Sequence, residues 1–126
     1  MLAAAALAIA AAPAPALPSR ADVEGALYWQ AGSLCRLLID DCVDGEGNEI
    51  NPLPRFTVSA LECRPAAARR ATCSFTSVRH YGPDNVLPSE RCTGTLQSHD
   101  EGGATIWNFV VPDPRRHSLT ALLSCN

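Results

Sequence analysis

The chain has 126 residues and a formal net charge of −3, and arginine supplies all ten of its positive side chains. This length favours a single domain with one hydrophobic core. A mildly acidic chain lacks the basic surface that is typical of proteins that bind nucleic acids or anionic membranes. We therefore expect one domain and no nucleic-acid partner.

The first sixteen residues, MLAAAALAIAAAPAPA, contain no charged side chain, and positions 2–12 form an apolar run of eleven residues. Such a run is too short to cross a bilayer as a helix, but it matches the hydrophobic region of a secretory signal peptide. Ala14, Pro15 and Ala16 supply the small-x-small pattern of a cleavage site. We predict a signal peptide over 1–16, a mature domain over 17–126 and a periplasmic or extracellular location. No basic residue precedes the run, so a disordered alanine- and proline-rich tail is the alternative.

Six cysteines all follow the expected cleavage point. An even number of cysteines in a short exported chain predicts three disulfide bonds. No CxxC pair occurs, which argues against a zinc site or a thioredoxin-type redox centre. We pair Cys63 with Cys73; the other four cysteines allow alternatives, among which we favour Cys35 with Cys42 and Cys92 with Cys125. No further apolar stretch is long enough for a transmembrane helix.

One helix is predicted over residues 20–39. Ser19 stands three residues before Asp22, which is the spacing of a capping box at a helix start. Apolar residues then recur at steps of three and four, at Val23, Leu27, Ala31 or Leu34, and Leu38. This pattern indicates an amphipathic helix, and the glycines and prolines over 44–54 indicate a loop after it.

Four runs with partial alternation of apolar and polar residues follow, over 55–63, 71–80, 90–99 and 104–111. Such alternation is typical of antiparallel strands with one face on the core. The segment 118–125 fits either a fifth strand or a short helix. The sequence thus predicts an α+β fold, with one N-terminal amphipathic helix packed on a curved antiparallel sheet of four or five strands, stapled by disulfides. This element order resembles cystatin-like folds and small microbial ribonucleases, although no motif of either family is present.

The predicted disulfide between Cys63 and Cys73 sets the register of the first hairpin. It pairs the following residues across the two strands: Leu61 with Phe75, and Val58 with Val78. For the second hairpin we expect a four-residue turn over 100–103. That turn pairs Leu96 with Trp107 and Gly94 with Phe109. We expect Trp29 and Trp107 to lie in the core between helix and sheet rather than to line a ligand pocket.

The loop between the paired cysteines, CRPAAARRATC, contains three arginines, Arg64, Arg69 and Arg70. A rigid loop of this kind can present an arginine to the acidic specificity pocket of a trypsin-like protease, because preorganisation lowers the entropic cost of binding. The simpler interpretation is a stapled turn, since closing this loop with a disulfide stabilises a fold by about 3 kcal/mol. We favour the stapled turn and keep the three arginines as candidate binding residues.

A catalytic alternative uses histidine acid–base chemistry, as in small secreted ribonucleases. Its candidate residues are His117, Arg116, His99 and Glu62, and the arginine would stabilise a developing phosphate charge. The five carboxylates over 40–49 do not have the spacing of an EF-hand calcium loop. No nucleotide-binding, metalloprotease or serine-hydrolase motif is present, so we expect no metal and no cofactor.

The interpretation that we favour is an exported, non-catalytic binding or inhibitory module with a protein partner of unknown identity. A ribonuclease-like hydrolase is the first alternative, and a structural envelope protein is the second. The hydrolase requires two of its candidate side chains around one cleft, whereas an inhibitor requires a protruding rigid loop or an unpaired strand edge.

Overall fold

The computed structural model describes residues 16–37, 54–111 and 123–126. Its elements, in chain order, are α1 (Arg20–Leu37), β1 (Arg55–Ala67), β2 (Arg70–His80), β3 (Glu90–Glu101), β4 (Ala104–Phe109) and β5 (Leu123–Cys125). The strands form one antiparallel sheet in the order β1-β2-β3-β4, and β5 also pairs with β3. The predicted α+β arrangement of one helix on an antiparallel sheet is therefore confirmed, and the segment 118–125 contributes a strand. Among the described helical residues, none forms a segment long and apolar enough to cross a bilayer.

Helix α1 begins with the reciprocal hydrogen bonds of a capping box. The Ser19 backbone N–H donates to Asp22 Oδ2 at 2.8 Å, and the Asp22 backbone N–H donates to Ser19 Oγ at 3.1 Å. The helix spans Arg20–Leu37, against an expected span of 20–39. The predicted loop over 44–54 lies outside the described residues apart from Pro54, as do Leu38 and Ile39.

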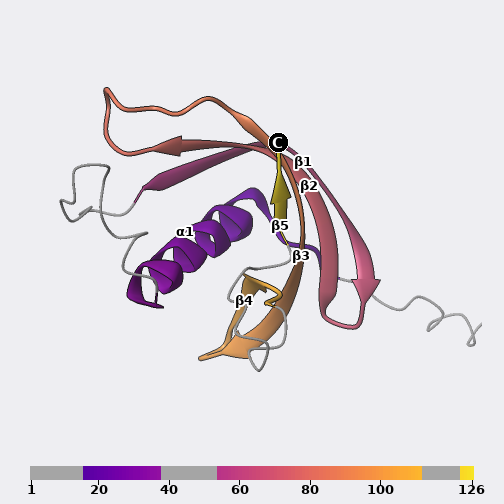
Figure 1. Ribbon diagram of the computed structural model, residues 1–126. Helices are drawn as coiled ribbons and strands as arrows, with labels where there is room; N and C mark the ends of the chain where they lie inside the picture. The colour runs from indigo at the N-terminus through magenta and orange to yellow at the C-terminus, as the bar shows by residue number, and fades with distance from the viewer. Residues whose placement is uncertain (1–15, 38–53, 112–122) are drawn as a thin grey trace, which may run out of the picture.

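The core lies between α1 and the sheet, and the helix contacts both β1 and β4, the two ends of the strand order (Figure 1). Val23, Ala26 and Leu27 form the buried face of the helix. Trp107 is 5 % exposed, as expected, but Trp29 is 52 % exposed, so the predicted core position of Trp29 is wrong. Each residue turns an α-helix by about 100°, which places Trp29 more than about 100° from the middle of the buried face.

Strand β1 contains a bulge at Ala60 that the sequence did not reveal. Cys63 lies opposite Cys73 as predicted, but the register shifts between Ser59 and Glu62, so that Val58 lies opposite Ser77 rather than Val78. Ala60 has a φ of 49° within this shift. A bulge exchanges the two faces of a strand at the inserted residue. As a result, four side chains on both sides of the bulge contact the core: Phe56, Val58, Leu61 and Cys63.

The β3–β4 hairpin turns over two residues, not over the predicted four. Gly102 and Gly103 have φ values of 58° and 83°, and the pair Glu101 and Ala104 closes the turn. Two successive positive φ values form the tight turn that best matches the twist of antiparallel strands. The predicted register was therefore wrong by two residues. The observed pairs are Leu96 with Phe109 and Ser98 with Trp107, while Gly94 lies opposite Cys73 and Leu123.

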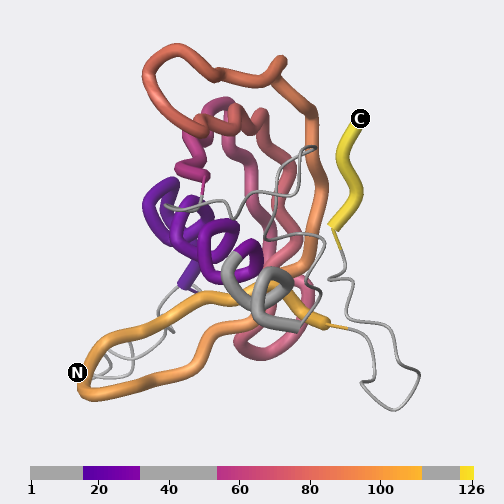
Figure 2. Tube along the Cα trace, turned by 60° about the vertical axis from the view of Figure 1, so that its left-hand side comes forward, coloured from indigo at the N-terminus to yellow at the C-terminus, as the bar shows by residue number. Residues whose placement is uncertain are grey.

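One edge of β3 pairs with β2, and the other edge pairs with β4 and then with β5. Figure 2 shows the β3–β4 hairpin extending past the helix, with the C-terminal strand beside the other end of β3. Two disulfides join directly opposed residues, Cys63 with Cys73 and Cys92 with Cys125, and both were predicted. The side chains of the third predicted pair lie outside the described residues. Disulfides of this kind indicate an oxidising, exported environment.

Candidate ligand pocket

Two of the three arginines of the stapled loop, Arg69 and Arg70, have partners on β3. Arg69 has a φ of 58°, and its side chain donates to the Ser98 carbonyl oxygen at 3.2 Å and to Asp100 Oδ1 at 2.9 Å. The hydrogen bond from Arg69 lowers the pKa of Asp100 below its usual value, with a smaller contribution from Thr105. Arg70 Nε donates to Gln97 at 3.2 Å. Both side chains therefore tie the tip of the β1–β2 hairpin to β3, and Arg64 is exposed on β1.

Two residues of the catalytic alternative lie far apart on the sheet. Glu62 is opposite Ser74, which in turn is opposite Thr93 on β3. His99 lies six residues further along β3 than Thr93, and this distance along a strand is about 20 Å. His99 instead contacts Glu101, with 3.3 Å between Nε2 and Oε2. His117 and Arg116 lie outside the described residues, so the complete constellation stays a prediction.

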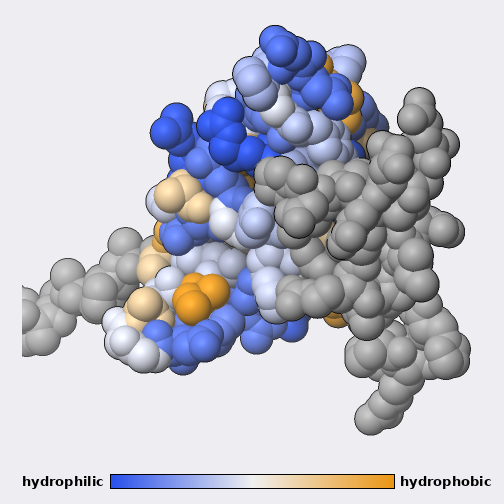
Figure 3. All heavy atoms as spheres, turned by 90° about the vertical axis from the view of Figure 1, so that its left-hand side faces the viewer, coloured by the Kyte–Doolittle hydropathy of each residue, from blue (hydrophilic) through white to orange (hydrophobic). Residues whose placement is uncertain are grey.

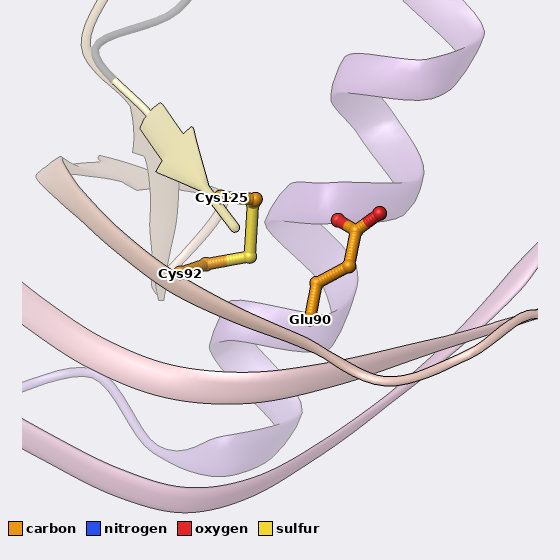
Figure 4. Close-up of side chains that lie close together, drawn as sticks. All are labelled: Glu90, Cys92 and Cys125. Carbon is orange, nitrogen blue, oxygen red and sulfur yellow. A yellow bond between two sulfur atoms is a disulfide. The ribbon is translucent and has the colours of Figure 1, made fainter.

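Glu90, Cys92 and Cys125 lie together at one end of β3 (Figure 4). Their oxygen and sulfur atoms all lie within 4.8 Å of one another, as the ligands of a metal ion would. However, the two sulfur atoms are bonded to each other, and the form of cysteine that binds metals is the free thiolate. The disulfide and the Glu90 side chain instead line one wall of a pocket.

The pocket lies between α1 and the adjoining ends of β2, β3 and β5, and has a volume of about 230 Å³. Most of its lining is apolar: Leu27, Ala31, Pro54, Phe56, Leu87, Pro88, Cys92, Leu123 and Cys125. Its polar lining residues are Gln30, Ser77, Arg79, Tyr81 and Glu90. An apolar pocket with a few convergent polar groups is the usual form of a small-molecule site.

Several polar groups of the pocket have unused hydrogen-bonding capacity. Gln30 Oε1 is buried and has no hydrogen-bond partner, which is uncommon for a buried polar atom. Arg79 Nη1 lies 3.4 Å from the Tyr81 hydroxyl, and the guanidinium carbon lies 5.9 Å from the centre of the Phe56 ring. These contacts engage one nitrogen of the guanidinium and leave most of its five N–H donors available.

Arg79 and Glu90 place opposite charges on the same face of the sheet. Ser77 lies directly opposite Glu90, so Arg79, two residues further along β2, is the diagonal neighbour of Glu90. Diagonal positions of this kind are separated by about 7–8 Å between Cα atoms. The ion pairs of the described residues do not include one between Arg79 and Glu90. Both charges are therefore available to a ligand.

Sequence reasoning missed both residues, although a signal was present. Along β2, alternate positions from Ala71 through Phe75 to Ser77 are buried, and the next position with the same orientation is Arg79. On β3 the same alternation leads from Leu96 back through Cys92 to Glu90. A charged residue at an inward-facing strand position is an exception to the pattern and indicates a site.

The described residues on the face shown in Figure 3 are mainly hydrophilic, and apolar side chains are scattered there singly or in small groups. Scattered apolar residues are normal on soluble proteins and do not mark a binding surface. No protein-family model, curated protein or solved structure matches this chain.

Proposed function

We propose that this protein is an exported, non-catalytic binding protein and that its binding site is the pocket between α1 and the sheet. The observation that carries this proposal is the presence, in one apolar pocket, of two opposite charges, Arg79 and Glu90, that do not pair with each other. Leaving polar groups unpaired costs stability. Their retention beside a cavity is explained if a ligand completes their hydrogen bonds.

Export is supported by the two disulfides, which are typical of proteins that work outside the reducing cytosol. Together with the predicted signal peptide they favour a periplasmic or extracellular site of action. The expected protein partner stays a separate prediction. The pocket has the size of a small molecule or of a single inserted side chain rather than that of a protein interface.

The non-catalytic part of the proposal rests on the spacing of the polar groups. Nucleophilic catalysis requires a nucleophile and a base in direct hydrogen-bond contact, about 2.6–3.2 Å apart. Ser77 and Glu90 face each other across β2 and β3, yet the hydrogen bonds of the described side chains do not join them. This arrangement favours recognition of a ligand over activation of a nucleophile.

Backbone-amide NMR of the oxidised protein tests the proposal. Small molecules with a ring-sized apolar body, such as ethylbenzene, should shift the amide signals of the pocket residues, and glucose should not. Ala31 lines the pocket, and Ala21 is exposed on the same helix. Ala31→Phe should abolish the shifts by filling the pocket, and Ala21→Phe should preserve them. If no apolar probe shifts the pocket signals, or if Ala31→Phe leaves the shifts unchanged, the proposal is wrong.

A further inference from the structure

We infer that the ligand of this pocket is a free α-amino acid with an apolar side chain. In this assignment the Arg79 guanidinium binds the carboxylate, the Glu90 carboxylate accepts hydrogen bonds from the ammonium group, and the apolar walls hold the side chain. This inference rests on the proposed function and adds the chemical class of the ligand.

The size of the pocket limits the side chain. An apolar cavity of about 150 Å³ holds one benzene molecule. The pocket, at about 230 Å³, therefore has room for one ring or a branched aliphatic chain together with a small polar head. Larger ligands, such as a sugar chain or a long acyl chain, exceed this volume.

The donors of Arg79 favour a carboxylate at one side of the pocket. A guanidinium presents N–H donors in a planar fork that matches the two oxygens of a carboxylate. The guanidinium carbon lies 5.9 Å from the centre of the Phe56 ring, and the Tyr81 hydroxyl engages only one of the guanidinium nitrogens, at 3.4 Å. The other N–H donors of the fork remain for a carboxylate.

The Glu90 carboxylate, diagonal to Arg79 on the same face of the sheet, favours an ammonium group. An ammonium group has three N–H donors and no acceptor, so it requires several acceptors around it. The Glu90 carboxylate lines the pocket and offers two acceptor oxygens.

The combination of both charges separates a free amino acid from other ligands. A peptide end carries only one of the two charges beside its terminal side chain, and a simple carboxylic acid or amine likewise carries one. In a free amino acid both charged groups and the side chain leave the same carbon atom. Such a ligand satisfies the diagonal pair of Arg79 and Glu90 while its side chain enters the apolar part of the pocket.

A series of four ligands tests the assignment by calorimetry on the oxidised protein. L-Phenylalanine carries both charges, 3-phenylpropanoate lacks the ammonium group, 2-phenylethylamine lacks the carboxylate, and ethylbenzene lacks both. No ligand of the series is larger than phenylalanine, so a loss of affinity cannot come from a steric clash. A hydrogen bond to a charged group is worth roughly tenfold or more in affinity. We therefore expect phenylalanine to bind at least about tenfold more tightly than either singly charged analogue.

Two charge-removing variants assign each ligand group to its residue. Glu90→Gln should weaken phenylalanine and 2-phenylethylamine by about tenfold and leave 3-phenylpropanoate within about twofold. Arg79→Gln should weaken phenylalanine and 3-phenylpropanoate by about tenfold and leave 2-phenylethylamine within about twofold. Arg55→Gln and Asp84→Asn remove one charge each from exposed positions outside the pocket lining, and they should leave all four affinities unchanged.

The ethylbenzene arm separates the possible failures. If ethylbenzene binds as tightly as phenylalanine, the amino-acid assignment is wrong while the pocket remains a binding site. If no ligand of the series binds, the proposed function fails with it. If a variant loses ethylbenzene together with the charged ligands, the substitution has altered the pocket itself, and the assigned role of that charge is overturned.

Discussion

Replacing Ala60 by glycine should stabilise the protein, although glycine normally weakens a strand. Ala60 is exposed, and its φ of 49° lies in the left-handed region, which a residue with a Cβ atom enters at a cost of about 1–2 kcal/mol. Glycine removes that cost. The bulge is also held by Arg91, whose Nη1 donates to the Ala60 carbonyl oxygen at 3.1 Å and to Thr76 at 3.2 Å, and glycine retains the carbonyl.

The net gain is the difference between two opposing terms. Glycine gains conformational entropy in the unfolded chain, which costs about 0.5–1 kcal/mol on folding. Subtracting this from the relief of strain leaves a stabilisation of about 0.5–1 kcal/mol. For a domain of this size, that gain raises Tm by about 2–4 °C.

Thermal and urea unfolding of the oxidised protein measure the effect, with Ala67→Gly as the matched control. Ala67 is exposed on the same strand, but its φ is not positive. This control should lower stability by about 0.5–1 kcal/mol. If Ala60→Gly destabilises the protein as much as Ala67→Gly does, the bulge does not place Ala60 in a left-handed conformation and the reasoning is refuted.

Three further predictions concern the staples and the hairpin tip. Replacing Cys92 and Cys125 together by alanine should cost about 4 kcal/mol in urea unfolding, because this disulfide closes a loop with a sequence separation of 33; a loss below about 1 kcal/mol would contradict this. The lowered pKa of Asp100 means that its contribution to stability is complete above the unfolded pKa of about 3.9 and is lost as the pH falls through the folded value. In an NMR titration, Arg69→Gln should raise that pKa toward its ordinary value, and an unchanged midpoint would be evidence against the contact. The oxidised protein should neither inhibit trypsin nor be cut quickly after Arg69, because this residue is left-handed and bound to Asp100; stoichiometric inhibition would support the protease-binding interpretation instead.

The strands could be predicted because alternation survives in each of them, but their exact pairing depends on single residues. The alternation of β1 changes phase at Ala60, and a sequence pattern that changes phase resembles a weak strand rather than a bulged one. Likewise, the sequence of residues 100–103 is compatible with a four-residue turn and with a two-residue turn. The two positive φ values at Gly102 and Gly103 decide between them, and they follow from the twist of the assembled sheet.

The two disulfides were predictable for a different reason. Cys63 and Cys73 flank a short loop between two alternating runs, so antiparallel pairing alone brings them together. Cys92 and Cys125 required the last segment to return to β3, which nothing in its local pattern specifies; only the need to pair the remaining cysteines indicated it.

The pocket shows most clearly where a sequence contains information that local patterns do not use. Arg79 continues the inward-facing positions of β2, and Glu90 begins those of β3. β2 and β3 pair directly in antiparallel fashion, which places the end of β2 beside the start of β3, so these two charges lie close together on the core side of the sheet. The sequence could not show that space remains there, because this depends on how α1 and β5 cover that end of the sheet. An inward charge that is covered completely must find a partner within the protein, whereas an inward charge beside a cavity can bind a ligand. The cavity, rather than the charges alone, is therefore what turns an irregularity of the strand pattern into a candidate site.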